Sequence, residues 1–140
     1  MYTGARRVSW RLVPEVAGVR ITLADERSKV RFALRALLQR QTDMEVVGEA
    51  ANAQELIALA EIGSPDIILV DCELPGSELS DLLNTLRGMC PDAMIIALSG
   101  RVDARQRAQK AGVDAFVSKG DPPERLLSAI QSCAQRCSGL

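Results

Sequence analysis

Residues 66–71 read DIILVD, in which four consecutive apolar residues stand between two aspartates. A short apolar run of this kind is typical of a strand that is covered on both faces, as in a parallel sheet between helices. Residues 94–98 form a second run of the same type. Functional groups in such sheets lie beyond the carboxyl ends of the strands, so Asp71 is the first candidate functional residue.

Short apolar runs alternate with helical patterns along the chain. The five expected strands are Val19–Ala24, Glu45–Glu49, Asp66–Val70, Met94–Leu98 and Ala115–Ser118. The clearest helical stripe between them is Val30, Ala33, Leu34, Leu37 and Leu38, spaced i, i+3, i+4, i+7 and i+8. Strict alternation predicts right-handed crossovers and a parallel sheet. The expected fold class is α/β, a flavodoxin-like doubly wound (βα)5 arrangement with strand order 2-1-3-4-5.

Local signals mark the ends of three helices. Asn52 followed by Glu55 is a variant of the capping box and predicts the start of the second helix. Gly112 stands where the fourth helix should end. Pro122 and Pro123 suit the start of the fifth.

Composition restricts the chemistry of the protein. The chain has 140 residues, a net charge of −1 and no histidine. It therefore contains no histidine-based catalytic triad, no histidine metal ligand and no phosphohistidine of its own. Its near-neutral charge gives no electrostatic argument for binding nucleic acid or an anionic membrane. The four cysteines form no C-x-x-C pair and are expected to be reduced thiols.

The ends of the chain differ from its centre. Residues 1–18 are expected to be a tail outside the core, with the folded domain spanning 19–137. Arginines at positions 6, 7 and 11 interrupt the apolar residues of the tail, so it does not resemble a signal peptide. No apolar run reaches the ~18–20 residues that span a membrane. These features predict a cytoplasmic protein with no membrane partner.

Polar residues follow the predicted strands at one edge of the sheet. Asp25 and Glu26 follow the first strand, Asp71 the third, Ser99 the fourth and Lys119 the fifth. Three neighbouring carboxylates would repel one another and raise their pKa values, and a hard divalent cation relieves that repulsion. Mg²⁺ takes oxygen ligands and usually keeps several waters. The cluster therefore predicts a magnesium site.

This set of groups suits phosphoryl transfer. One carboxylate can attack a phosphoryl group while the metal neutralises phosphoryl oxygens. Lys119 would act as a point charge on another oxygen, and Ser99 would donate a hydrogen bond to a third. Phosphoryl transfer depends mainly on positioning and charge stabilisation, which this set provides.

Four segments resemble response-regulator receiver domains of two-component systems. They are LADE (Leu23–Glu26), LVDCELPG (Leu69–Gly76), ALSG (Ala97–Gly100) and FVSKGDPPE (Phe116–Glu124), in the order and with the separations of that family. The resemblance covers about residues 19–137 and is greatest to the NarL/FixJ group, whose full-length members usually add a LuxR-type DNA-binding domain.

The resemblance implies a role for each residue of the predicted site. Asp71 would be the phosphoacceptor, Ser99 the switch hydroxyl and Lys119 the phosphate-binding lysine. Phe116 occupies the position of the switch aromatic, although a plain core aromatic would occupy it equally well. Mg²⁺ would be held by Asp25, Glu26, Asp71 and the backbone carbonyl of Glu73.

The resemblance also implies partners. A histidine kinase or phosphotransfer protein would donate the phosphoryl group, and the face made by helix 4, strand 5 and helix 5 would then change to control partner binding, dimerisation or transcription. A homodimer is expected by resemblance alone. The chain would be a signalling domain that catalyses only its own phosphorylation and dephosphorylation. No DNA-binding domain is expected in these 140 residues, which fit either a single-domain regulator or the receiver of a longer one.

Departures from the family pattern keep two alternatives open. Glu26 stands where aspartate is commoner, Leu79 where glycine is usual, and Gly120 where many receivers have proline. These departures would suit a receiver fold that acts as a phosphorylation-independent interaction module. A small Mg²⁺-dependent phosphatase is disfavoured, because Cys72 and Glu73 follow Asp71 in place of the D-x-D pattern of such enzymes.

The predicted fourth helix is basic. It is preceded by Arg101 and carries Arg105, Arg107 and Lys110. A solvated face explains such charges, and a docking surface is the alternative. Its small alanine stripe predicts a weakly anchored helix, and weakly anchored elements are those that move most easily.

Overall fold

A computed structural model describes residues 18–138 of the chain. The expected tail therefore lies, apart from Gly18, outside the described residues. The elements run in strict alternation: β1 (Val19–Ala24), α1 (Ser28–Gln39), β2 (Met44–Ala50), α2 (Ala53–Gly63), β3 (Ile67–Asp71), α3 (Leu79–Met89), β4 (Met94–Ser99), α4 (Ala104–Ala111), β5 (Ala115–Ser118) and α5 (Pro123–Ser138). Within residues 18–138 no helix is both long enough and apolar enough to cross a membrane.

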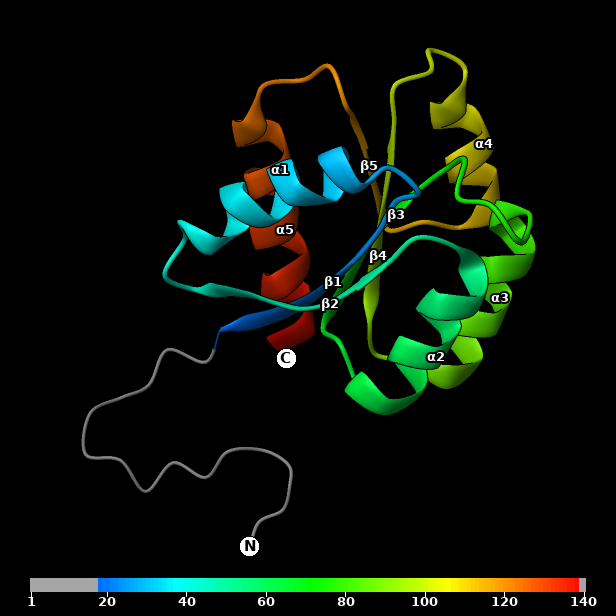
Figure 1. The fold of residues 1–140 in the computed structure, drawn as a ribbon, viewed down its shortest axis with the longest axis horizontal. Helices are drawn as coiled ribbons and strands as arrows, with labels where there is room; N and C mark the ends of the chain where they lie inside the picture. The colour runs from blue at the N-terminus through cyan, green and yellow to red at the C-terminus, as the bar shows by residue number, and fades with distance from the viewer. Residues whose placement is uncertain (1–17, 139–140) are drawn as a thin grey trace, which may run out of the picture.

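The sheet is parallel and has the order β2-β1-β3-β4-β5, which confirms the predicted fold class. Helices α1 and α5 cover one face, and α2, α3 and α4 cover the other (Figure 1). Because side chains alternate along a strand, β3 sends Ile67 and Leu69 to the first face and Ile68 and Val70 to the second. All four are at most 1% exposed, as a strand covered on both faces requires.

The predicted helix ends are confirmed. Asn52 accepts a hydrogen bond from the Glu55 backbone N–H at 2.9 Å, and the Glu55 carboxylate accepts from the Ala51 N–H at 2.8 Å. Gly112 ends α4 with a φ of 95°, a left-handed conformation that suits glycine. Helix α5 begins at Pro123, as the paired prolines predict.

Helix α1 departs from its predicted stripe. Leu38 is fully buried and Leu34 and Leu37 pack beside it, but Ala33 is exposed. The Phe32 ring is 66% exposed and lies near the Arg35 guanidinium, 6.0 Å from centroid to Cζ. The apolar face of α1 is therefore narrower than the spacing predicts, because the helix covers an edge of the sheet rather than its centre.

The loop after β3 shows why Leu79 is tolerated where glycine is usual. Gly76 takes the left-handed conformation in this loop, with a φ of 105°. Leu79 is instead the first residue of α3, and its side chain is buried in the apolar core. Gly76 thus takes the left-handed conformation that the loop requires, and position 79 is free to carry an apolar side chain that packs in the core.

Candidate phosphoryl-transfer site

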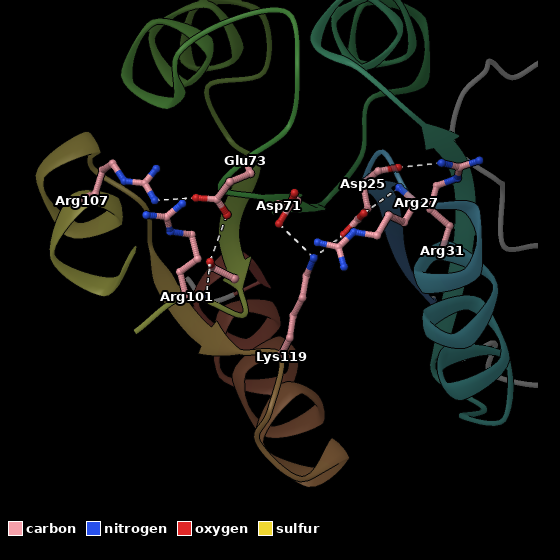
Figure 2. A network of polar contacts seen from close by, with 9 residues as sticks. Asp25, Arg27, Arg31, Asp71, Glu73, Arg101, Arg107 and Lys119 are labelled. Carbon is pink, nitrogen blue, oxygen red and sulfur yellow. Dashed lines mark hydrogen bonds and ion pairs between the residues drawn. The ribbon is translucent and has the colours of Figure 1, made fainter. Parts of the chain in front are cut away.

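The carboxyl ends of β1, β3 and β5 bring three charged groups into contact (Figure 2). The Lys119 Nζ lies 2.7 Å from Asp25 Oδ2 and 3.0 Å from Asp71 Oδ1. Both carboxylates are almost fully buried, and the lysine side chain is 19% exposed. One ammonium therefore bridges two buried carboxylates, which offsets the repulsion between them.

The position of Asp25 is set by the loop that follows β1. Its Oδ1 accepts a hydrogen bond from the Arg27 N–H at 2.9 Å. Its backbone carbonyl accepts from Arg31 Nη1 at 2.6 Å, and the Arg31 Nε contacts Glu49 Oε1 at 3.2 Å. Arg31 thus ties the loop to β2. Arg31 was not predicted, because an arginine among the polar positions of a helix carries no distinguishing signal in the sequence.

Asp71 and Lys119 influence each other's protonation. Burial raises the pKa of Asp71 above the ordinary aspartate value, and the hydrogen bond and charge of Lys119 only partly lower it. Burial by itself lowers the pKa of Lys119, but the hydrogen bonds and charges of Asp25 and Asp71 outweigh it and leave that pKa raised. Lys119 therefore stays cationic at neutral pH.

Ser99 lies at the end of β4 and is fully buried. Its Oγ donates a hydrogen bond to Glu73 Oε1 at 3.1 Å and accepts one from the Arg101 N–H at 3.0 Å. The second oxygen of Glu73 contacts Arg107 Nη2 at 2.5 Å (Figure 2). The family resemblance implied a role only for the backbone carbonyl of Glu73, and the sequence gave no sign that the Glu73 side chain contacts Arg107.

Glu26 does not join the other carboxylates. It is exposed, and within residues 18–138 no three acidic, cysteine or histidine side chains gather as a metal cluster would. The predicted set of three carboxylates is thus represented by Asp25 and Asp71. The physical reason is that Asp25 and Asp71 already share one ammonium, so a third carboxylate buried beside them would lose hydration and be repelled.

The remaining oxygen donors still fit Mg²⁺. Asp25 and Asp71 converge on a single cation in this structure, the Lys119 ammonium. The Glu73 backbone carbonyl, two residues beyond Asp71, accepts no hydrogen bond from the described residues. Because Mg²⁺ is bound through one or two carboxylates and keeps several waters, two buried carboxylates and a carbonyl are a sufficient set.

Phe116 and Cys72 are neighbours of site residues in the sequence, three residues before Lys119 and one after Asp71. The Phe116 ring is half buried and packs against the apolar cluster under α2, α3 and α4, which leaves both of its predicted roles open. Cys72 is a free, buried thiol directly after Asp71. Burial raises the pKa of Cys72 to about 11, so this thiol is protonated at neutral pH and is a poor nucleophile.

Comparison with known proteins places this geometry in a family. The family model described as the response regulator receiver domain matches residues 21–131. The transcriptional regulatory protein YxjL of Bacillus subtilis, itself called uncharacterized, is 32% identical over 120 residues, covering 84% of this chain and 55% of that protein. The nitrate/nitrite response regulator protein NarL of Escherichia coli K12 is 33% identical over 116 residues, covering 81% and 54%.

A solved structure agrees with these relatives. The two-component response regulator of the LuxR family from Aurantimonas is 31% identical, with a TM-score of 0.77, over 84% of this chain and 86% of that one. The chain spans about half the length of the curated relatives it matches. The stretch matched by the family model contains Asp25, Asp71, Ser99 and Lys119. The chain belongs to the response regulator receiver domain family of two-component systems.

Proposed function

We propose that this chain is a phosphorylation switch in which Asp71 accepts a phosphoryl group from a partner histidine kinase or phosphotransfer protein. The observation that carries the proposal is the Lys119 ammonium between Asp25 and Asp71, at the carboxyl ends of three strands. Because these 140 residues contain no histidine, a histidine phosphodonor must lie outside them. The naming of NarL as a response regulator supports the same reading.

The chemistry follows from the positions of the side chains. An Asp71 carboxylate oxygen forms a bond to phosphorus as the bond from phosphorus to the donor nitrogen breaks, and the electron pair leaves with that nitrogen. Lys119 contacts Asp71 directly and is therefore placed to pair with a phosphoryl oxygen. Asp71 pairs with Leu98 in the sheet, so Ser99, the next residue of β4, is placed to donate its hydroxyl to the phosphoryl group.

Receiver domains in general bind Mg²⁺ at their phosphorylation site. Here Asp25, Asp71 and the Glu73 carbonyl would hold the ion, and the exposed Glu26 would complete the set by turning toward it. When bound, Mg²⁺ neutralises the charge that develops on the phosphoryl oxygens. Lys119, which neutralises the same carboxylates in this structure, is then available to the phosphoryl group.

The output is proposed to be a change in the face formed by α4, β5 and α5. Phosphorylation adds about one net negative charge at the site, because an acyl phosphate of charge about −2 replaces a carboxylate of charge −1, and such a local change of charge acts by biasing a movable element. This face would then control partner binding, dimerisation or transcription. The names of two relatives from Bacillus subtilis, the transcriptional regulatory proteins YxjL and DesR, support a transcriptional output.

Intact mass spectrometry tests the proposal. Wild type, Asp71→Asn and Asp81→Asn are incubated with acetyl phosphate and Mg²⁺; Asp81 is an exposed aspartate on α3 and serves as the matched control. We expect one phosphoryl adduct on wild type and on Asp81→Asn, and none on Asp71→Asn. An adduct that survives in Asp71→Asn would assign the acceptor elsewhere. No adduct in any form, with a cognate-type kinase included, would reject the proposal.

One observation favours the second candidate, a phosphorylation-independent interaction module. Glu26 is exposed and does not gather with Asp25 and Asp71, so the site is less strongly acidic than the sequence predicts. This module predicts that Asp71→Ala leaves partner binding unchanged. Parallel pull-downs of wild type and Asp71→Ala, with and without acetyl phosphate, distinguish the two functions.

A further inference from the structure

A single carboxylate connects three parts of the fold beside the phosphoacceptor. Glu73 lies in the loop after β3, and its Oε1 accepts the Ser99 hydroxyl at the end of β4 at 3.1 Å. Its Oε2 contacts Arg107 of α4 at 2.5 Å. Figure 2 shows Glu73 between Asp71 on one side and Arg107 on the other. Loop, strand end and helix are therefore held together by one side chain.

The Ser99 hydroxyl is fully used in this arrangement. An ionised carboxylate only accepts hydrogen bonds, so the single Ser99 proton points toward Glu73. The Ser99 oxygen also accepts the Arg101 N–H, and the residue is 0% exposed. A phosphoryl oxygen on Asp71 would need the same proton. The Ser99 contact with Glu73 must therefore break before Ser99 can serve the phosphoryl group.

Helix α4 depends on the Arg107 contact more than a helix with larger buried side chains would. Its buried apolar side chains are two alanines, Ala104 and Ala108. Alanine buries little apolar surface, so polar ties contribute a larger share of the anchoring of this helix. Arg107 ties it to Glu73, and Arg105 ties it to the Phe116 ring on β5.

A new negative charge at Asp71 would disturb the Glu73 contact. The charge of Glu73 already raises the pKa of Asp71, which shows that the two carboxylates affect each other. Phosphorylation would replace the single charge of the Asp71 carboxylate by about two negative charges on a group that reaches further from the aspartate, and these charges repel Glu73 and attract Arg107. The Glu73 and Arg107 side chains are 35% and 45% exposed, so their ion pair is partly screened and can exchange readily.

We propose that Glu73 and Arg107 form a latch, which holds Ser99 and α4 in the unphosphorylated arrangement and opens when a phosphoryl group occupies Asp71. The Glu73–Arg107 latch rests on the proposed phosphoacceptor function, and it adds a residue of α4, Arg107, to the control of the site. Arg107 is a positioning residue: it acts on Ser99 through Glu73 and touches neither Asp71 nor Lys119 in the described contacts.

The binding of beryllofluoride, a phosphoryl mimic, separates the latch from simple charge effects. Arg107→Gln breaks the latch, and Lys110→Gln removes one positive charge from an exposed position of the same helix. Loss of charge alone weakens the binding of an anion in both variants. Loss of the latch also weakens the hold of Glu73, which competes for the Ser99 hydroxyl. We therefore expect Arg107→Gln to bind beryllofluoride about two- to fivefold more tightly than Lys110→Gln, a ratio that corresponds to the free energy of one exposed ion pair. Fluorine NMR in the presence of Mg²⁺ measures both dissociation constants.

Hydrogen exchange tests the second half of the proposal. Without phosphodonor, the amides of Ala104–Ala111 should exchange faster in Arg107→Gln and in Glu73→Gln than in wild type, with Lys110→Gln unchanged. A variant that carries both Arg107→Gln and Glu73→Gln should exchange no faster than the faster of the two single variants, because both substitutions remove the same contact.

Opposite results would overturn the latch. They are an Arg107→Gln affinity equal to or weaker than that of Lys110→Gln, or α4 exchange in Arg107→Gln that matches Lys110→Gln. If wild type fails to bind beryllofluoride at all, the proposed function falls, and the exchange comparison alone then decides whether Glu73 and Arg107 anchor α4.

Discussion

The guanidinium of Arg105 lies over the ring of Phe116, with the Arg105 Cζ 4.8 Å from the ring centroid. Arg105 belongs to α4 and Phe116 to β5, so the pair joins two elements of the proposed output face. The half-buried Phe116 ring also packs against the apolar cluster beneath α4. Phe116 therefore contacts both an apolar surface and a cation, and a turn of the ring away from α4 would separate it from Arg105.

Replacing Arg105 by glutamine should loosen Phe116. We expect Arg105→Gln to lower the free energy of unfolding by about 0.5–1 kcal/mol, the usual contribution of an exposed cation–π pair. Urea unfolding measures this loss, and the aromatic NMR signals of Phe116 should become more averaged. Lys110→Gln, which alters the same helix without touching a ring, is the control. Equal stability and unchanged Phe116 signals in the two variants would contradict the prediction.

Replacing Lys119 by methionine should destabilise the protein strongly. It leaves the buried Asp25 and Asp71 carboxylates without their shared cation. Removing one partner of a buried ion pair costs about 3–5 kcal/mol, and partial exposure of Lys119 places the expected loss near 2–4 kcal/mol. Added Mg²⁺ should restore part of the loss, because it neutralises the same carboxylates. Lys29→Met, at an exposed position on α1, should change little.

Thermal unfolding with and without Mg²⁺ measures the Lys119→Met effect. The prediction fails if Mg²⁺ stabilises Lys119→Met no more than it stabilises Lys29→Met. In that case the two carboxylates do not share a divalent cation, and the magnesium site would have to lie elsewhere.

The protonation of Asp71 should depend on Lys119. Burial raises the pKa of Asp71 in the metal-free protein, and Lys119 partly lowers it. Lys119→Met should therefore raise that pKa further, whereas Lys29→Met should not change it. Carbon-13 NMR of the Asp71 carboxyl group, followed through a pH titration, measures the shift. An unchanged or lower pKa in Lys119→Met would show that burial and Lys119 do not oppose each other at this site.

The sign of the pH dependence follows from the raised pKa. The folded state holds its Asp71 proton more tightly than the unfolded state does, so this residue favours folding below the unfolded pKa. That contribution is lost as the pH rises through the folded pKa. The nucleophile is the deprotonated form, so phosphorylation by acetyl phosphate should decline as the pH falls through the same raised value.

Replacing each of two glycines by alanine should change the stability of the protein in opposite directions. Gly76 has a φ of 105°, and an added Cβ would lie 3.2 Å from the Ala53 Cβ. Gly88 lies within α3, and nothing stands within 4 Å of an added Cβ. We expect Gly76→Ala to destabilise the protein by about 1–2 kcal/mol. Gly88→Ala should stabilise it by about 0.5–1 kcal/mol. Denaturant unfolding compares them, and a neutral Gly76→Ala would show that the loop rearranges without cost.

The strands were predictable because burial on both faces leaves continuous apolar runs. Val19–Ala24 and Ala115–Ser118 have the predicted bounds, and the other three strands differ by a residue at their ends. The stripe of α1 was less predictable. Spacing indicates which residues share a helix face, but it does not tell how much of that face the sheet covers. Ala33 was therefore expected to be buried, whereas it is exposed to solvent.

The charged site was predictable where backbone position alone determines it. Asp25, Asp71 and Lys119 follow directly from strands, and the parallel sheet brings strand ends together. Their contact confirms the expected juxtaposition, while their roles remain predictions. Glu26 shows that position in the sequence does not by itself determine burial, because Asp25 is buried and the next residue, Glu26, is exposed. The contact of Glu73 with Arg107 crosses 34 positions and depends on side-chain conformation, for which the sequence carries no signal.

The contact between Asp25 and Lys119 joins residues that are 94 positions apart, one after the first strand and the other after the last. Synthesis on the ribosome delivers Asp71 long before it delivers Lys119. A nascent chain thus carries Asp71, the proposed acceptor, without the ammonium that pairs with it. The cluster of Asp25, Asp71 and Lys119 therefore forms only after the last strand of the domain has been made and has joined the sheet.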